Sequence, residues 1–166
     1  MECPFDGVII RKLTRHEDHR GWLTELFRSD ELPARNLPAM SYVSMTLPGV
    51  ARGPHEHVDQ DDLFCFIGPS MFRLYLWDNR EDSPTFGGSW SLDVGAENMV
   101  AIIVPAGVVH AYRNIGKENG IVFNAPNRLY AGQGRKEPVD EIRHEDEPDT
   151  RFSMAAIDRK LAESAQ

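Results

Sequence analysis

Short apolar runs, bounded by Gly, Pro and Asp, recur along most of this 166-residue chain. Runs of this length and spacing are typical of the strands of an all-β sandwich or barrel. The predicted strands cover residues 7–13, 22–28, 41–47, 63–67, 70–77, 89–94, 99–104, 110–114 and 120–125. Residues 78–88 are rich in Asp, Pro and Gly and predict a loop. The number of strands is that of a double-stranded β-helix, or jelly roll.

The composition of the chain changes after Asn127. Residues 131–149 are polar and hold two Gly and two Pro, which predicts an irregular segment wrapped over the barrel. Residues 153–163 carry apolar side chains at a helical spacing, with Ser153 as the N-cap of a short helix. Without a linker or repeat, we expect one domain over residues 1–166, with a core of about 7–130 and a C-terminal wrap and helix at 131–166.

Composition and charge narrow the possible partners. The net charge of -8 argues against nucleic acid, whose phosphates require a basic face. No apolar run approaches the roughly 20 residues that span a bilayer, and the N-terminus lacks the pattern of a secretory signal. Two cysteines do not make a disulfide framework. We therefore expect a cytoplasmic protein with neither a nucleic-acid nor a membrane partner.

The candidate chemistry lies in a group of histidines. His55 and His57 are one residue apart, and on a strand this spacing points their imidazoles to the same face. Asp62, with His110 from another strand, would complete a pocket of three imidazoles and one carboxylate. Gln60 is a competing fourth ligand. Such a set suits a divalent transition metal, namely Fe, Mn, Ni, Cu or Zn, whose identity the sequence leaves open.

The spacing of these residues follows two known motifs. From Gly49 to Asp62, the order is Gly, five residues, His, one residue, His, four residues and an acidic residue, which resembles the first motif of the cupin superfamily. Pro105-x-Gly107-x-x-His110-x-x-x-Asn114 resembles the second. Asp62 replaces the usual Glu, and Met99 stands where a Gly is expected. The resemblance implies an all-β cupin jelly roll, either holding a metal or using its histidines without one.

A narrower resemblance rests on four motifs in order. They are Asp18-x-Arg20-Gly21-x-x-x-Glu25, Gly49-Val-x-Arg52-Gly53-x-His55, Asp78-x-Arg80-x-x-Ser83-Pro84-Thr85-Phe86-Gly87 and Pro105-x-Gly107-x-x-His110. Together they resemble the dTDP-4-dehydrorhamnose 3,5-epimerase family over roughly residues 7–130. The resemblance implies a homodimer that exchanges N-terminal strands, and a nucleotide diphosphate bound by Arg20, Glu25 and Arg52. It places His55 at the position of the catalytic base.

Three departures from that family concern the active site, two of them in the reaction and one in nucleotide binding. Asp62 stands where the family has a lysine that stabilises an enolate, and Asn124 stands where it has a tyrosine that returns the proton. Positions that contact the nucleotide base hold Met40 and Tyr42. An enolate needs compensating positive charge, which a bound divalent ion supplies as a Lewis acid. Asp62 without a metal would repel an enolate, whereas with a metal it becomes a ligand.

Two hypotheses follow from these residues. In the first, the protein is an isomerase or epimerase of a nucleotide-activated, dTDP-type keto-sugar in carbohydrate biosynthesis, assisted by a metal. His55 is the base only if it does not ligate the metal; otherwise Glu56, Tyr75 and Tyr112 are the candidates. In the second, the protein is a metal-binding cupin that binds a sugar or small acid without isomerising it, or an oxygenase-like cupin.

Overall fold

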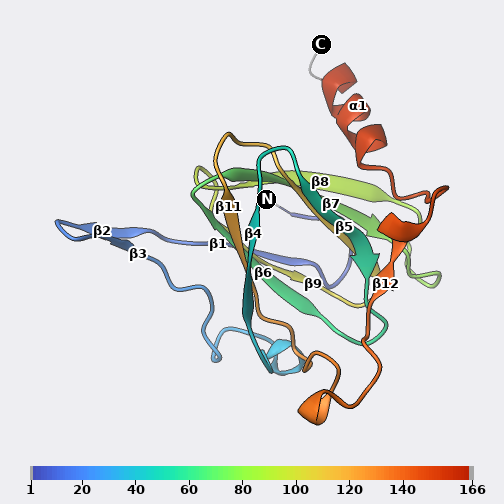
Figure 1. Cartoon of the computed structure of the whole chain (residues 1–166), viewed down its shortest axis with the longest axis horizontal. Coiled ribbons are helices and arrows are strands. Elements are labelled where there is room, and N and C mark those ends of the chain that lie inside the picture. The colour runs from blue at the N-terminus through green and yellow to red at the C-terminus, as the bar shows by residue number, and fades with distance from the viewer. Residues whose placement is uncertain (1, 165–166) are drawn as a thin grey trace.

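Two five-stranded antiparallel sheets face each other in the computed structural model, which describes residues 2–164 (Figure 1). The first sheet consists, in spatial order, of β1 (Ile9–Lys12), β9 (Val100–Val104), β6 (Asp62–Gly68), β11 (Gly120–Asn124) and β4 (Tyr42–Thr46). The second consists of β12 (Ile142–Arg143), β5 (Ala51–Glu56), β10 (Val108–Asn114), β7 (Met71–Asp78) and β8 (Ser89–Gly95). The predicted all-β cupin jelly roll with a short C-terminal helix is confirmed.

Strands β6, β9 and β10 are buried on both faces, which explains why they read as nearly continuous apolar runs. In β6, Phe64 and Phe66 point between the sheets, where they join the main core. Leu63 and Cys65 point outward and pack with Leu13 under the N-terminal segment. Both cysteines are free, and Cys65 is buried.

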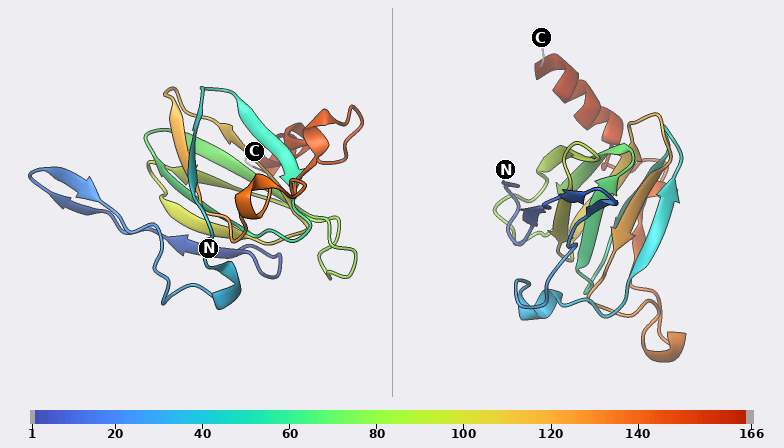
Figure 2. Two further views of the ribbon diagram at one scale, coloured as in Figure 1. Left: turned by 60° about the horizontal axis from the view of Figure 1, so that its bottom comes forward. Right: turned by 90° about the vertical axis from the view of Figure 1, so that its left-hand side faces the viewer.

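A hairpin of β2 (His16–Asp18) and β3 (Gly21–Leu23) projects from the barrel (Figures 1 and 2). The strand predicted over residues 22–28 is therefore wrong beyond Leu23. Within the described residues 2–164, no strand pairs with residues 24–28. Leu26 packs instead against the outer cluster around Cys65, where side-chain burial rather than a hydrogen-bond ladder holds it. A short 3-10 helix, η1 (Ala34–Asn36), follows before β4 begins.

The C-terminal segment returns across the second sheet. It contains η2 (Gln133–Arg135), β12, η3 (His144–Asp146) and α1 (Met154–Ser164). Ser153 caps α1 as predicted, because its Oγ accepts the Ala156 amide at 3.3 Å. Phe152 and Ile157 pack on the outer face against Tyr75. In the described residues 2–164, no helix is long and apolar enough to cross a membrane.

Residues 126–147, here called the strap, bring this segment to one end of the barrel. Within the strap, β12 pairs with β5, so that Ile142 lies opposite Glu56 and Arg143 lies opposite His55. The strap therefore meets the predicted histidine motif directly.

Candidate active site

Three histidines converge at this end of the barrel. His55 on β5 and His110 on β10 are register partners, and His57 follows directly after β5. Their ring centroids are 4.5 Å apart for His55 and His110, 5.7 Å for His57 and His110, and 6.0 Å for His55 and His57. One nitrogen of each ring lies within 4.8 Å of the others, a spacing that could hold a metal ion. The convergence predicted from the sequence is confirmed.

Asp62 reaches the same cluster from β6 in the facing sheet. Its Oδ2 lies 3.0 Å from His57 Nε2 and 3.3 Å from His110 Nε2. Its Oδ1 accepts hydrogen bonds from Asn124 Nδ2 at 2.9 Å and from Gln60 Nε2 at 3.1 Å. Asp62 Oδ2 and His110 Nε2 are nevertheless buried without a well-oriented hydrogen-bond partner. Both of the predicted fourth ligands, Asp62 and Gln60, thus lie beside the histidines.

Burial and the Asp62 charge set the protonation of this cluster. Burial disfavours the charged form of His57, but the Asp62 carboxylate outweighs it and raises the pKa of His57 to about 9. Burial would raise the pKa of Asp62, yet His110 and His57 hold it well below its usual range. Burial, followed by His110, lowers the pKa of His55 to about 2. Without an ion, His57 is therefore cationic at neutral pH and His55 is neutral.

The outer nitrogens of two rings are held by backbone carbonyls. His57 Nδ1 donates to the carbonyl of Asp140 in the strap, and His110 Nδ1 donates to that of Val108 at 3.1 Å. Both rings therefore present Nε2 to Asp62. Metal-ligating histidines are characteristically oriented in this way, by a carbonyl or carboxylate on the second nitrogen. The ring orientations and the unpartnered atoms of His110 and Asp62 fit a divalent ion.

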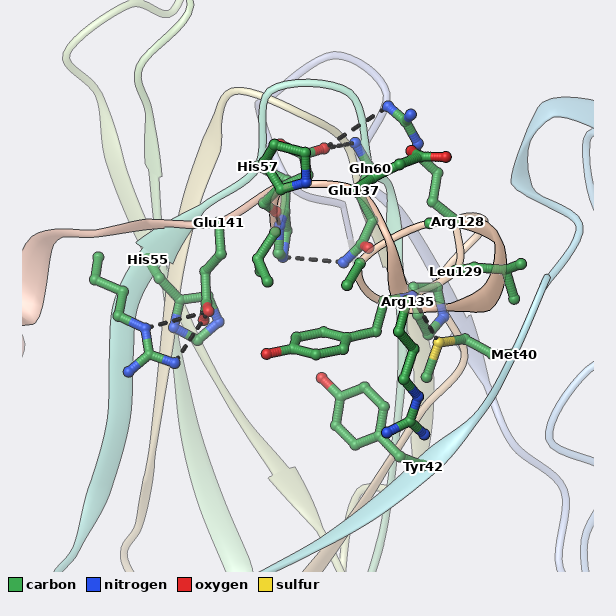
Figure 3. Close-up of a pocket in the computed structure, with 18 residues that line it drawn as sticks. Met40, Tyr42, His55, His57, Gln60, Arg128, Leu129, Arg135, Glu137 and Glu141 are labelled. Atoms are coloured by element: carbon green, nitrogen blue, oxygen red, sulfur yellow. Dashed lines mark hydrogen bonds and ion pairs between the residues drawn. The ribbon is translucent and has the colours of Figure 1, made fainter.

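Two cavities of about 390 and 380 Å³ open beside the cluster. Residues of the strap make most of the wall of the larger one. Tyr42, His55, Glu141 and Arg143 line both cavities, and Figure 3 shows Tyr42 and His55 on different sides of the pocket. Glu141 and Arg143 form an ion pair of 3.1 Å. Each cavity has the volume of a small-molecule site.

A carboxylate that the sequence reasoning missed lies beside His55. Glu145 Oε1 is 3.9 Å from His55 Nδ1. The preceding residue, His144, donates from Nε2 to Glu56 Oε1 at 2.9 Å on the opposite face of β5, which fixes η3 against the strand. Nothing in the local pattern around Glu145 marks it, because its position depends on the pairing of β12 with β5.

Of the three residues predicted to bind the diphosphate, only one lines a cavity beside His55. Arg52 lines the smaller cavity with His55 and donates to Thr46 Oγ1 at 3.0 Å. Arg20 and Glu25 line neither cavity. Arg20 lies at the projecting hairpin, where its side chain is 76% exposed and pairs with Asp18. Within one chain, the structure does not bring Arg20 and Glu25 to His55.

Of the three alternative bases, Tyr112 faces the cavity, where its hydroxyl lies 3.0 Å from Ser44 Oγ. Glu56 points to the other face of β5, toward His144. Tyr75 also points away, and its hydroxyl donates to Asp158 on α1 at 3.0 Å. The alternation of side chains along β5 and β7 excludes both of these residues from the pocket.

Comparison with known proteins identifies the group to which this site belongs. A model of the dTDP-4-dehydrorhamnose 3,5-epimerase family matches residues 2–147. The chain belongs to this family. The epimerase predicted from the sequence motifs is confirmed at the level of the family.

Two relatives of this epimerase family are similar in sequence. "Probable low-salt glycan biosynthesis epimerase Agl13" of Haloferax volcanii is 39% identical over 125 residues, which cover 74% of this chain and 79% of that protein. "Spore coat polysaccharide biosynthesis protein SpsL" of Bacillus subtilis is 38% identical over 112 residues, covering 68% and 73%. The crystal structure of a dTDP sugar isomerase from Desulfovibrio desulfuricans shares the fold, with a TM-score of 0.79 at 24% identity over 93% of this chain and 95% of the other.

The departures from the epimerase motifs meet at one place in the structure. Asn124 donates to Asp62 and also to the hydroxyl of Tyr42, at 2.7 Å. Met40 and Tyr42 line the larger cavity. The exchanged residues of this family member are therefore neighbours, not scattered substitutions.

Proposed function

We propose that this protein epimerises a nucleotide-activated, dTDP-type keto-sugar in carbohydrate biosynthesis. His55 takes the proton from the carbon beside the sugar carbonyl. The observation that carries this proposal is the position of the His55 imidazole in the cavity wall, with the Glu145 carboxylate and the buried His57–Asp62–His110 cluster as its neighbours. A base must be unprotonated to act, and Glu145 lies where it stabilises the imidazolium that forms.

A separate role, metal binding, falls to His57, His110 and Asp62. They hold a divalent transition metal, since Asp62 already contacts Nε2 of both rings and the second nitrogen of each ring is held by a carbonyl. When bound, such an ion supplies the positive charge that favours an enolate beside it. His55 shares the triangle of rings but has Glu145 as its neighbour, which leaves it available for the proton.

The test is to supply a panel of nucleotide-linked keto-sugars and follow the stereochemistry of the product by NMR. Epimer formation with at least one dTDP-linked keto-sugar is the expected result. Thermal stabilisation by the same compounds without any product would contradict the proposal and favour a cupin that only binds the sugar, because ligand binding alone raises stability.

We expect Arg52→Ala to weaken the binding of a dTDP-sugar by about 10- to 100-fold while leaving the metal content unchanged. Arg52 and His55 both line the smaller cavity, where charge-assisted hydrogen bonds to a diphosphate would be stronger than neutral ones. Calorimetric titration measures the affinity, and elemental analysis measures the metal. Arg52→Lys is the matched control, which keeps the charge and should recover part of the affinity. Unchanged affinity in Arg52→Ala would remove this residue from the diphosphate site.

We infer a homodimer in which the projecting β2–β3 hairpin of one copy reaches the cavity of the other. Arg20 is free of its own barrel, and Trp22 and Leu23 on the hairpin expose large apolar side chains. Such exposure on a projecting hairpin is typical of a segment that packs on a partner. Light scattering should give twice the 18.8 kDa mass of the chain. A mass of one chain at micromolar concentration would contradict the dimer.

A further inference from the structure

Tyr42 presents a phenol beside the Asn124 amide. The two residues are register partners on β4 and β11, and Asn124 Nδ2 donates to the Tyr42 hydroxyl at 2.7 Å. Asn124 Nδ2 is itself held by Asp62 Oδ1 at 2.9 Å, which fixes the amide. Within residues 2–164, the Tyr42 hydroxyl accepts this bond and has no hydrogen-bond acceptor for its own proton. That proton is free to be donated into the cavity.

Tyr42 and His55 belong to different walls of the site. Tyr42 stands on β4 at the edge of the first sheet, and His55 stands on β5 in the second sheet. Both residues line the 390 Å³ cavity and the 380 Å³ cavity. In Figure 3 the Tyr42 ring extends into the pocket from a different side than His55 does. A molecule in this space would meet the phenol on the wall from the first sheet and the imidazole on the wall from the second.

The remaining phenols fit this position less well. Tyr112 has its hydroxyl engaged with Ser44 and lines only the smaller cavity. Tyr130 lines only the larger cavity. Tyr75 bonds Asp158 outside the pocket. Of the four tyrosines in the sequence, Tyr42 is therefore the one that shares both cavities with His55.

We propose that Tyr42 is the catalytic acid, which delivers a proton to the face of the sugar opposite to the face from which His55 removes one. This assignment rests on the epimerase proposed above. His55 takes the C–H proton, and the electron pair of that bond forms the enolate. The enolate carbon then takes the proton of the Tyr42 hydroxyl, the C–O⁻ bond returns to a carbonyl, and the configuration is inverted. Water restores the phenol and removes the proton from His55.

The test separates proton removal from inversion. In deuterated water, Tyr42→Phe should lose epimer formation by at least about 100-fold, the contribution typical of a positioned acid. It should retain transfer of solvent deuterium into the substrate with unchanged configuration, because His55 returns a deuteron to the face that it deprotonated. Tyr75→Phe, which removes a phenol of the outer face, is the matched control and should form the epimer as the wild type does. NMR reads both deuterium content and configuration.

Several outcomes would overturn the assignment. A folded Tyr42→Phe variant that forms epimer at the wild-type rate excludes Tyr42 as the acid, and one that loses exchange and inversion together gives it a structural role. A wild type that shows neither exchange nor inversion refutes the proposed function instead. If Tyr42→Phe does not fold, fluorotyrosine at position 42 replaces it. The rate of inversion should then fall at a lower pH than in the wild type, whereas the pH dependence of deuterium exchange should stay the same. Identical pH dependences of inversion in the two proteins would exclude Tyr42.

Discussion

Replacement of His55 by Gln is expected to lower kcat/KM for epimerisation by about 10²- to 10⁴-fold, the range typical of a general base. Glutamine approximates the size of the imidazole but cannot take a proton at neutral pH. Because His57, His110 and Asp62 contact one another without His55, the metal content should remain that of the wild type. Steady-state kinetics and elemental analysis of the same sample provide the two measurements.

The activity and the metal content of His55→Gln test different parts of the account. Loss of activity together with the metal would show that His55 is a ligand, and would move the proton transfer to another residue. Tyr112, which faces the cavity, would then be the candidate base that remains. Full activity in His55→Gln would remove the residue from the reaction altogether.

Replacement of His57 by Ala is expected to abolish metal binding and to lower turnover by about 10²- to 10³-fold, the usual cost of losing one group that stabilises a developing oxyanion. The variant removes an imidazole whose Nε2 lies 3.0 Å from Asp62. His19→Ala, in the turn between β2 and β3, is the matched control and should keep the metal. Retention of the ion by His57→Ala would contradict the proposed ligand set.

The same residue gives the metal-free protein a defined pH dependence. The pKa of His57 is raised to about 9 from the ordinary 6.5, so its pairing with Asp62 stabilises the fold fully below pH 6.5. This stabilisation is lost as the pH rises through about 9. Denaturant unfolding of the metal-free wild type from pH 6 to 10 should show the decline, and His57→Ala should lack it. Because an ion displaces the proton from His57, metal binding below pH 9 should release protons.

Much of the barrel was predictable from short segments of sequence. Apolar runs such as 63–67 and 99–104 carry enough β-branched and aromatic residues to define strands, and the motif spacing identifies His55, His57 and Asp62 as members of the site. The strand predicted at 22–28 fails because alternation alone does not show whether a neighbouring strand exists. Leu26 is apolar for packing against the outer cluster, not for a position in a sheet.

The missing parts of the site come from contacts that are distant in sequence. Glu145 reaches His55 because β12 pairs with β5, and the Asp140 carbonyl reaches His57 Nδ1 through the same strap. Neither residue stands in a motif, since the polar, irregular sequence of the strap has no periodicity to place it. Tyr42 was visible as a departure from the family, but its phenol could be placed beside Asn124 only from the β4–β11 register.

The most direct test of the central claim is transfer of solvent deuterium into a dTDP-linked keto-sugar, followed by NMR with the metal-loaded wild-type protein. We expect deuterium at the carbon beside the carbonyl, an inverted configuration at that carbon, and a rate that falls to background in His55→Gln. A dTDP-sugar that binds, as shown by calorimetry, but acquires no deuterium would contradict the epimerase. Exchange at the wild-type rate in His55→Gln would contradict the assignment of this imidazole as the base.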